Sequence, residues 1–132
     1  MRTMKRIIET DEAPQAIGPY SQATEVGGVL YVSGQIAIDP ATGRFTGGSV
    51  AEQTDLVLKN TGAILRAAGY TYENVVKSTV VLTTMDHFAA MNEVYNRYYA
   101  VNRPARATYA VQGLPKGALV EIDAIAVKPS SP

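Results

Sequence analysis

The sequence contains no cysteine and only one histidine, His87. Disulfide bonds, thiolate nucleophiles and cysteine-based zinc sites are therefore excluded. Any metal site would depend on carboxylates, and the acidic residues do not follow the pattern of a calcium-binding loop, so we expect no metal. We predict that His87 is exposed in the first turn of a helix. A Ser-His-Asp triad built on Ser21 or Ser33 is therefore poorly supported.

The sequence also lacks an excess of either charge and any long apolar run. Twelve Lys and Arg residues balance twelve Asp and Glu residues, for a formal net charge of zero. A nucleic-acid partner is disfavoured, because phosphate neutralisation by basic residues supplies most of the affinity for nucleic acids. No apolar stretch is long enough to span a membrane, and none follows the basic N-terminus as a secretory signal requires. We expect a cytoplasmic protein that does not engage a membrane.

The 132 residues, of which 46% are hydrophobic and 18% charged, are ordinary for a globular protein. This length predicts a single domain over residues 1–132 with a core of its own. Glycine and proline clusters separate extended runs rich in β-branched residues, and Gly27-Gly28 suits a tight hairpin turn. The predicted strands are residues 4–10, two strands within 23–36, then 74–84, 106–111 and 119–127.

Two helices are predicted between these strands. Ser49 and Glu52 form a capping box at the start of the first helix, and Gly69 ends it. The second helix is predicted to start near Asp86, a good N-cap, and to run to about Val101. Its apolar stripe consists of Phe88, Met91, Tyr95 and Tyr98/Tyr99.

The element order is therefore three strands, a helix, a strand, a helix and two strands. This order predicts an α+β fold, in which a mixed six-stranded sheet carries both helices on one face. The other face of the sheet is then uncovered, and we expect it to be buried in an oligomer.

The last two strands carry the most informative charges. Alternation places Arg106 with Thr108 on one face of its strand, and Glu121 with Asp123 on one face of the next. The opposite face of the last strand is wholly apolar and consists of Val120, Ile122, Ala124 and Ala126. Two interpretations remain open at this point. Arg106 and a carboxylate form a structural pair, which spacing alone slightly favours, or Arg106 grips a planar anion with two parallel hydrogen bonds. In the second case, a desolvated Glu121 of raised pKa could exchange a proton with bound water.

Other polar residues have both a structural and a functional interpretation. Asn92 lies on the apolar stripe of the second helix, where its amide either bonds to a loop backbone or contacts a ligand or pins a site loop. The segments GPYSQ (residues 18–22) and SGQ (residues 33–35) place hydroxyl groups beside glycines. Turn chemistry explains both segments, but glycine also lets the backbone approach a ligand closely.

Four segments together resemble a known family: AIGPYSQA, YVSGQIAIDPATG, AGYTYENVVKSTVVLTTMDHFAAMNEVYNRYY and RPARATYAVQGLPKGALVEIDAIAV. In order and spacing they are similar to the RidA/YjgF family of reactive-intermediate (enamine/imine) deaminases, from about Pro14 to Val127. The resemblance implies a chorismate-mutase-like fold and a homotrimer with sites in the clefts between subunits. It implies a 2-iminobutanoate/2-iminopropanoate deaminase, which hydrolyses enamines and imines of amino-acid metabolism to 2-keto acids and ammonia. No cofactor is expected, because an imine is already electrophilic.

The resemblance also assigns roles to individual residues. Arg106 matches the arginine that binds the substrate carboxylate, and Glu121 matches the glutamate that positions or activates water. Thr108 stands where some members carry a cysteine, so we expect it to line the site without thiol chemistry. Four further residues match positions that border the ligand: Tyr20, Ser33, Gly34 and Asn92. These matches favour substrate binding by Arg106 over the structural pair.

Two other functions remain as alternatives. Some relatives are described as endoribonucleases or translation inhibitors, although neutral charge and the lack of a histidine acid–base pair weigh against this activity here. The third possibility is a non-catalytic trimer that binds keto acids through the same Arg106 cleft and acts as a regulator.

Overall fold

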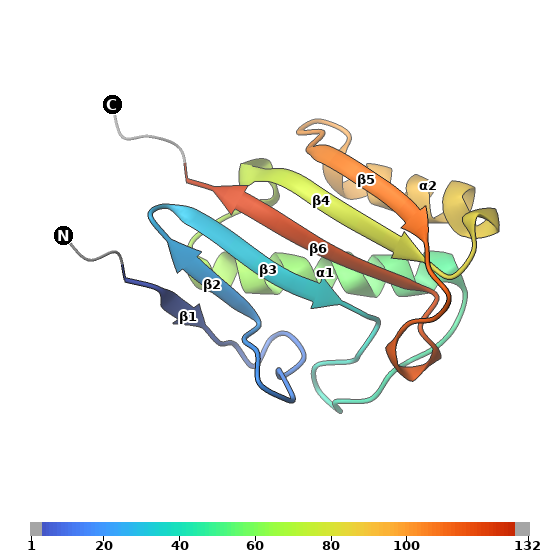
Figure 1. The fold of residues 1–132 in the computed structure, drawn as a ribbon, viewed down its shortest axis with the longest axis horizontal. Helices are drawn as coiled ribbons and strands as arrows, with labels where there is room; N and C mark the ends of the chain where they lie inside the picture. Colours follow the sequence, from blue (N-terminus) through green and yellow to red (C-terminus); the bar gives the residue numbers. More distant parts are fainter. Residues whose placement is uncertain (1–3, 129–132) are drawn as a thin grey trace.

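Six strands form one sheet in the order β1-β2-β3-β6-β4-β5 (Figure 1). The structure is a computed structural model, and it describes residues 4–128. All neighbouring strands are antiparallel except β4 and β5, which are parallel and joined through the second helix. The predicted mixed six-stranded sheet is thus confirmed. Its strands are β1 Arg6–Ile8, β2 Ala23–Val26, β3 Val29–Gln35, β4 Val75–Leu82, β5 Ala105–Ala110 and β6 Val120–Val127.

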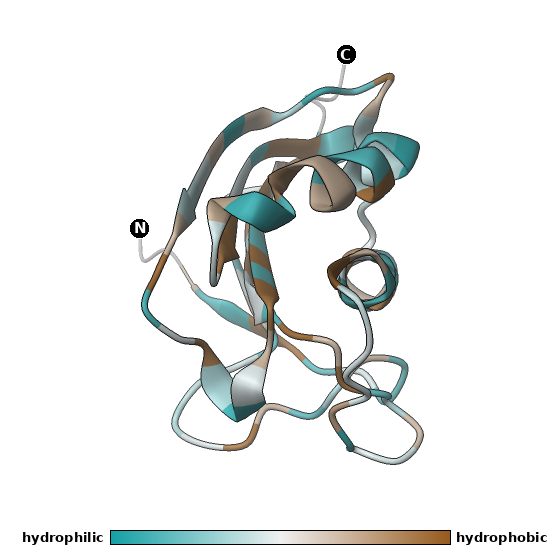
Figure 2. Cartoon of the chain, turned by 90° about the vertical axis from the view of Figure 1, so that its right-hand side faces the viewer, coloured by the Kyte–Doolittle hydropathy of each residue, from teal (hydrophilic) through white to brown (hydrophobic). Residues whose placement is uncertain are grey.

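Both long helices, α1 (Val50–Ala68) and α2 (Phe88–Tyr99), lie on the same side of the sheet, as predicted (Figure 2). The capping box between Ser49 and Glu52 is present at the start of α1. Gly69 ends the helix in the left-handed conformation, with φ of 86°, which glycine adopts without a steric penalty.

The predicted start of the second helix is wrong. Thr84, in an extended conformation, accepts a hydrogen bond from the Asp86 backbone N–H at 3.2 Å and opens a short 3₁₀ turn, Met85–His87. The α-helix follows only at Phe88, so Asp86 is not its N-cap. His87 ends the 3₁₀ turn and is half-buried rather than exposed as predicted.

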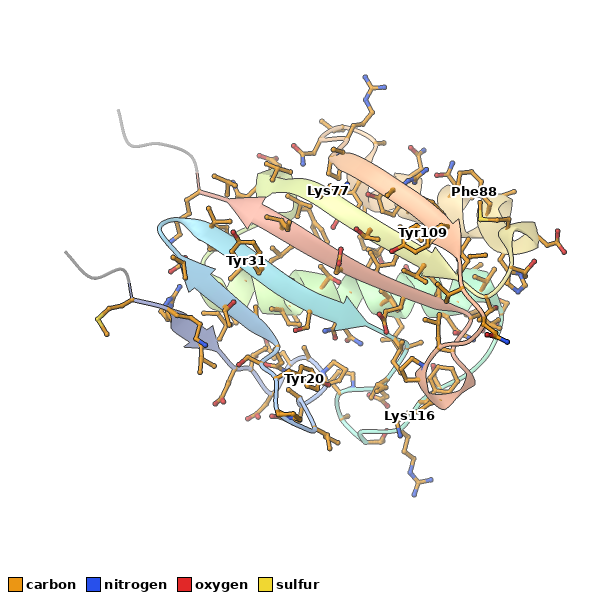
Figure 3. The ribbon with its side chains drawn as sticks, viewed as in Figure 1. Tyr20, Tyr31, Lys77, Phe88, Tyr109 and Lys116 are labelled. Carbon is orange, nitrogen blue, oxygen red and sulfur yellow. The ribbon has the colours of Figure 1, made fainter. Side chains whose placement is uncertain are left out.

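The two faces of the sheet have different character. The helix-facing side of β6 consists of Val120, Ile122, Ala124 and Ala126, all buried, which confirms the apolar face expected from alternation. On the opposite face, Tyr31 and Tyr109 remain 50% and 49% exposed. Figure 3 shows these two tyrosines and Lys77 spread over that uncovered face.

Two further structural findings bear on function. Within residues 4–128, neither helix is long and apolar enough to cross a membrane. The same residues contain no group of three or more His, Asp or Glu side chains placed to hold a metal ion.

Candidate functional site

Arg106 and Glu121 lie on opposite faces of the sheet. Strand β4 separates their strands, and Arg106 is in register with Ser78, a residue buried on the helix-facing side. Glu121 is in register with Val81 and alternates with the buried residues of β6, so it projects from the uncovered face. A structural pair between Arg106 and a carboxylate of β6, which spacing alone slightly favoured, is therefore wrong. Among the described residues, Arg106 makes no salt bridge.

On the helix side, Arg106 belongs to a group of four residues, here called the Arg106 cluster: Phe88, Asn92, Tyr95 and Arg106. The guanidinium carbon lies 4.7 Å from the Tyr95 ring centre and 5.5 Å from that of Phe88. One guanidinium nitrogen donates to Asn92 Oδ1 at 2.8 Å. Asn92 thus bonds to the arginine and not to a loop backbone. A cavity of about 340 Å³ opens beside Arg106, Asn92 and Tyr95.

Phe88 and Tyr95 were missed as site residues by sequence reasoning, which treated them only as part of an apolar stripe. The signal was present in their spacing. Phe88, Asn92 and Tyr95 follow the i, i+4, i+7 spacing of one helical face. An amide between two aromatic residues on such a face presents one acceptor and two ring faces to a cation, a combination suited to arginine.

On the uncovered side, Glu121 lines a second cavity of about 460 Å³, here called the Glu121 cavity. Tyr20, Gly34 and Lys116 line it too, together with an apolar wall that includes Ile17 and Ile36. In Figure 3, Tyr20 and Lys116 lie at the same lower border of the sheet, on loops that are distant in sequence. The cavity therefore collects three of the predicted site residues: Tyr20, Gly34 and Glu121.

A β-bulge places Gly34 against Glu121. The register between β3 and β6 shifts between Val32 and Gln35, so that Ser33 and Gly34 lie in the irregular part of the strand. A Cβ atom on Gly34 would stand 2.8 Å from Glu121 Oε2 and 2.9 Å from its Cδ. Such a contact is too short for any side chain, so glycine is required for the Glu121 carboxylate to occupy this position.

The environment of Glu121 raises the pKa of its carboxyl group above the usual value. Partial burial is the main cause, because desolvation disfavours the charged form, and the negative charge of Asp123 adds to the effect. A carboxylate of raised pKa accepts a proton more readily than an exposed one, which suits it to general acid–base work.

Ser33 does not line the Glu121 cavity, but it holds the loop that does. Its hydroxyl donates to the Ser21 carbonyl at 2.6 Å, and its backbone N–H donates to the Gln22 carbonyl at 2.9 Å. These bonds fix the segment that carries Tyr20, which is 56% exposed. The structure thus gives Ser33 a role in holding the loop, while its predicted contact with a ligand stays a prediction.

Thr108 and Lys116 differ in their relation to the cavities. Thr108 borders neither cavity of the single chain, and its Oγ1 is buried without a hydrogen-bond partner among the described residues, so its predicted place in the lining of the site stays a prediction. Lys116, in the 3₁₀ turn Pro115–Gly117 before β6, lines the Glu121 cavity with φ of 57°. A non-glycine residue in this left-handed region is uncommon, and such strain is found preferentially at functional sites.

Comparison with known proteins places this geometry in a family. A family model described as Endoribonuclease L-PSP matches residues 10–128. The chain is 50% identical over 125 residues to the human 2-iminobutanoate/2-iminopropanoate deaminase, covering 95% of this chain and 91% of that protein. It is similar to a Yersinia pestis structure described as a conserved Rid family protein, with a TM-score of 0.92, 47% identity and coverage of 95% and 100% of the two chains. For the structure of E. coli TdcF with bound serine, the TM-score is 0.89 and the identity 41%, over 94% of this chain and 99% of that one. The chain therefore belongs to the RidA/YjgF family.

Proposed function

We propose that this protein is a 2-iminobutanoate/2-iminopropanoate deaminase, which hydrolyses reactive enamine and imine intermediates to 2-keto acids and ammonia. The observation that carries the proposal is the Arg106 guanidinium, held by α2 with no carboxylate paired to it among the described residues. An arginine oriented in this way is suited to bind a carboxylate through two parallel hydrogen bonds. The human protein that is 50% identical over 125 residues of this chain is named for this activity.

The proposed active site joins the Arg106 cluster of one subunit to the Glu121 cavity of the next. Within one chain the sheet separates Arg106 from Glu121, so both can reach one small substrate only if they come from different subunits. Such a contact joins two different surfaces, and contacts of this kind form a closed ring when the rotation between successive subunits closes. A homotrimer satisfies this requirement, and it would also cover the exposed tyrosines of the open sheet face.

Catalysis in this site proceeds by addition of water and loss of ammonia. Arg106 binds the carboxylate of the 2-imino acid, which fixes the imine carbon near the Glu121 cavity. An enamine first tautomerises to the imine by taking a proton on carbon and losing one from nitrogen. The oxygen of water then bonds to the imine carbon while the nitrogen gains a proton, and this gives a carbinolamine. The hydroxyl proton passes to the nitrogen as the C–N bond breaks, so that ammonia leaves and the hydroxyl oxygen becomes the carbonyl of the keto acid.

Glu121 orients the water and moves its proton. Because the carboxylate form is the acceptor, activity should be lost as the pH falls through the raised pKa of Glu121. The substrate itself is electrophilic, so the residues have to position and protonate it and need no organic cofactor for this step.

The alternative activity, ribonuclease, has the description of the family model in its favour. The chain does not offer the chemistry usual for RNA binding, since its formal charge is zero and His87 is its only histidine. The regulatory alternative would use the same Arg106 contact for keto-acid binding without turnover. The cytoplasmic location expected from the sequence stays a prediction.

The test couples a serine or threonine dehydratase to this protein and follows release of the keto acid. Wild-type protein should accelerate release, and Arg106→Ala should reduce kcat/KM by roughly a hundredfold, as expected for a lost carboxylate–guanidinium contact. The matched control is Arg97→Ala, which removes an exposed arginine of α2 whose one salt bridge among the described residues is with Glu93.

The outcomes separate the three functions. No acceleration by the wild type, or equal acceleration by Arg106→Ala, would overturn the deaminase proposal. Binding of 2-oxobutanoate without turnover would favour the regulator. Salt-sensitive RNA cleavage that persists through stringent purification would favour the ribonuclease.

A further inference from the structure

We infer that Phe88 and Tyr95 are positioning residues that orient the Arg106 guanidinium for the substrate carboxylate. The inference rests on the proposed function of Arg106 and deepens it. Affinity for the carboxylate would then be set by the aromatic face of α2 and not by the arginine alone.

Three contacts from one helix fix the guanidinium. The Tyr95 and Phe88 ring centres lie 4.7 Å and 5.5 Å from its central carbon, both within the range of cation–π attraction. Asn92 Oδ1 accepts a hydrogen bond from one terminal nitrogen at 2.8 Å. Two rings and one acceptor therefore restrict both the location and the rotation of the planar group.

Orientation matters because arginine has a long side chain with many rotamers. A free arginine must lose that freedom on binding, whereas one already held by its neighbours does not. The fork must also lie in the plane of the carboxylate to donate two parallel hydrogen bonds. Removing a ring should therefore weaken carboxylate binding even though the charge of Arg106 is retained.

The contribution of Tyr95 should come from its ring and not from its hydroxyl group. Tyr95 Oη is buried near the Ser78 hydroxyl, and among the described residues it forms no hydrogen bond with Arg106 or Asn92. Tyr95→Phe keeps the ring beside Arg106, whereas Tyr95→Leu removes it. A pair of variants at one position thus separates cation–π attraction from hydroxyl chemistry.

The experiment measures the dissociation constant of 2-oxobutanoate by titration calorimetry, together with kcat and KM, for Tyr95→Leu, Phe88→Leu and Tyr95→Phe. Both leucine variants should raise the dissociation constant and KM about tenfold, with a smaller effect on kcat. Tyr95→Phe should bind as the wild type does. The control is Tyr98→Leu, because Tyr98 is on the same helix but contacts Tyr72 and Asp55 instead of Arg106. It should lower the melting temperature without a comparable change in KM.

A double-mutant cycle makes the test specific for Arg106. The double variant Tyr95→Leu/Arg106→Lys should raise the dissociation constant by less than the product of the two single-variant increases. The reason is that lysine has no planar fork for the ring to orient. If neither Tyr95→Leu nor Phe88→Leu changes the dissociation constant, or if the effects are additive, the positioning role is overturned. Failure of the proposed function gives a different result, in which Arg106→Ala leaves turnover intact.

Discussion

The Arg106 cluster and the Glu121 cavity are built from different kinds of structure. The cluster depends on one helix and one edge strand, and among the described residues the hydrogen bond and both cation–π contacts to the guanidinium come from α2. The Glu121 cavity is assembled from a loop before β2, a bulge in β3 and the 3₁₀ turn before β6. A rigid helix suits a group that must hold a fixed plane, whereas loops and a bulge can enclose a substrate of variable shape.

The difference extends to electrostatics. The Arg106 cluster surrounds a permanent positive charge with rings and an amide. The Glu121 cavity instead leaves a carboxylate partly desolvated beside Asp123, which raises its pKa. The Arg106 cluster is thus suited to bind a negatively charged group and the Glu121 cavity to transfer protons, and the proposed site needs both.

The largest effect is expected when either region is disabled in every subunit, and combining the two defects in different subunits should restore part of the activity. Arg106→Ala and Glu121→Gln should each lose roughly a hundredfold or more in kcat/KM. Protein refolded from an equal mixture of the two variants should recover about one intact site in four, because in the proposed trimer each site takes Arg106 from one subunit and Glu121 from the next. Turnover assays on the mixture provide the measurement, and no recovery at all would mean that both residues act from one chain.

A smaller effect is expected from Gly34→Ala, which disturbs only the Glu121 cavity. The added Cβ would meet Glu121 Oε2 at 2.8 Å, so the carboxylate must move and kcat should fall about tenfold. Gly113→Ala is the matched control, since its Cβ would meet no atom within 4 Å. Equal kcat for the Gly34 variant and wild type would contradict the assigned position of the carboxylate.

Asp123→Asn tests the electrostatics of the Glu121 cavity. Asp123 raises the pKa of Glu121 through like-charge repulsion, so its neutralisation should lower that pKa. Activity that depends on the Glu121 carboxylate should then persist to lower pH than in the wild type. Asparagine can still accept the 2.8 Å hydrogen bond from the Thr79 backbone N–H. The pH profile of kcat/KM is the readout, and an acidic limb that stays in place or moves upward would count against the role of Glu121.

The smallest effect on activity is expected at Thr108, beside the Arg106 cluster in sequence but outside both cavities. Thr108→Val removes a buried hydroxyl that has no partner among the described residues, so stability should rise by about 1 kcal/mol and kcat/KM should change less than about twofold. Thr61→Val is the control, because the Thr61 hydroxyl donates to the Val57 carbonyl at 2.9 Å. That variant should gain no stability on thermal denaturation. A large loss of activity in Thr108→Val would place its hydroxyl on the substrate.

The sequence predicted the ends of an element well where adjacent residues determine them. The capping box at Ser49 and the terminal Gly69 fixed the ends of α1, since both act through hydrogen bonds and backbone angles of adjacent residues. The first strand was predicted too long, over residues 4–10. The backbone N–H of Thr10 donates to the Gln22 side chain at 2.7 Å instead of joining the sheet, a partner that local propensity cannot reveal.

The candidate site was predicted residue by residue but not in its arrangement. Arg106 and Glu121 were identified from their types and from the family resemblance. Their separation depends on the insertion of β4 between β5 and β6 and on a parallel register, which are long-range pairings. Asn92 was expected to bond to a loop or a ligand, and only the packing of α2 against β5 brought it to Arg106.

The sequence by itself determined the order of the elements, the apolar face of β6 and the family, because alternation, capping and motif spacing are properties of neighbouring residues. The tertiary structure alone decided that Arg106 rests between Phe88 and Tyr95, that Gly34 makes room for Glu121, and that the sheet divides these two regions. Each of these depends on which strands pair and in what register, and a shift of one residue would turn every side chain of a strand to the other face.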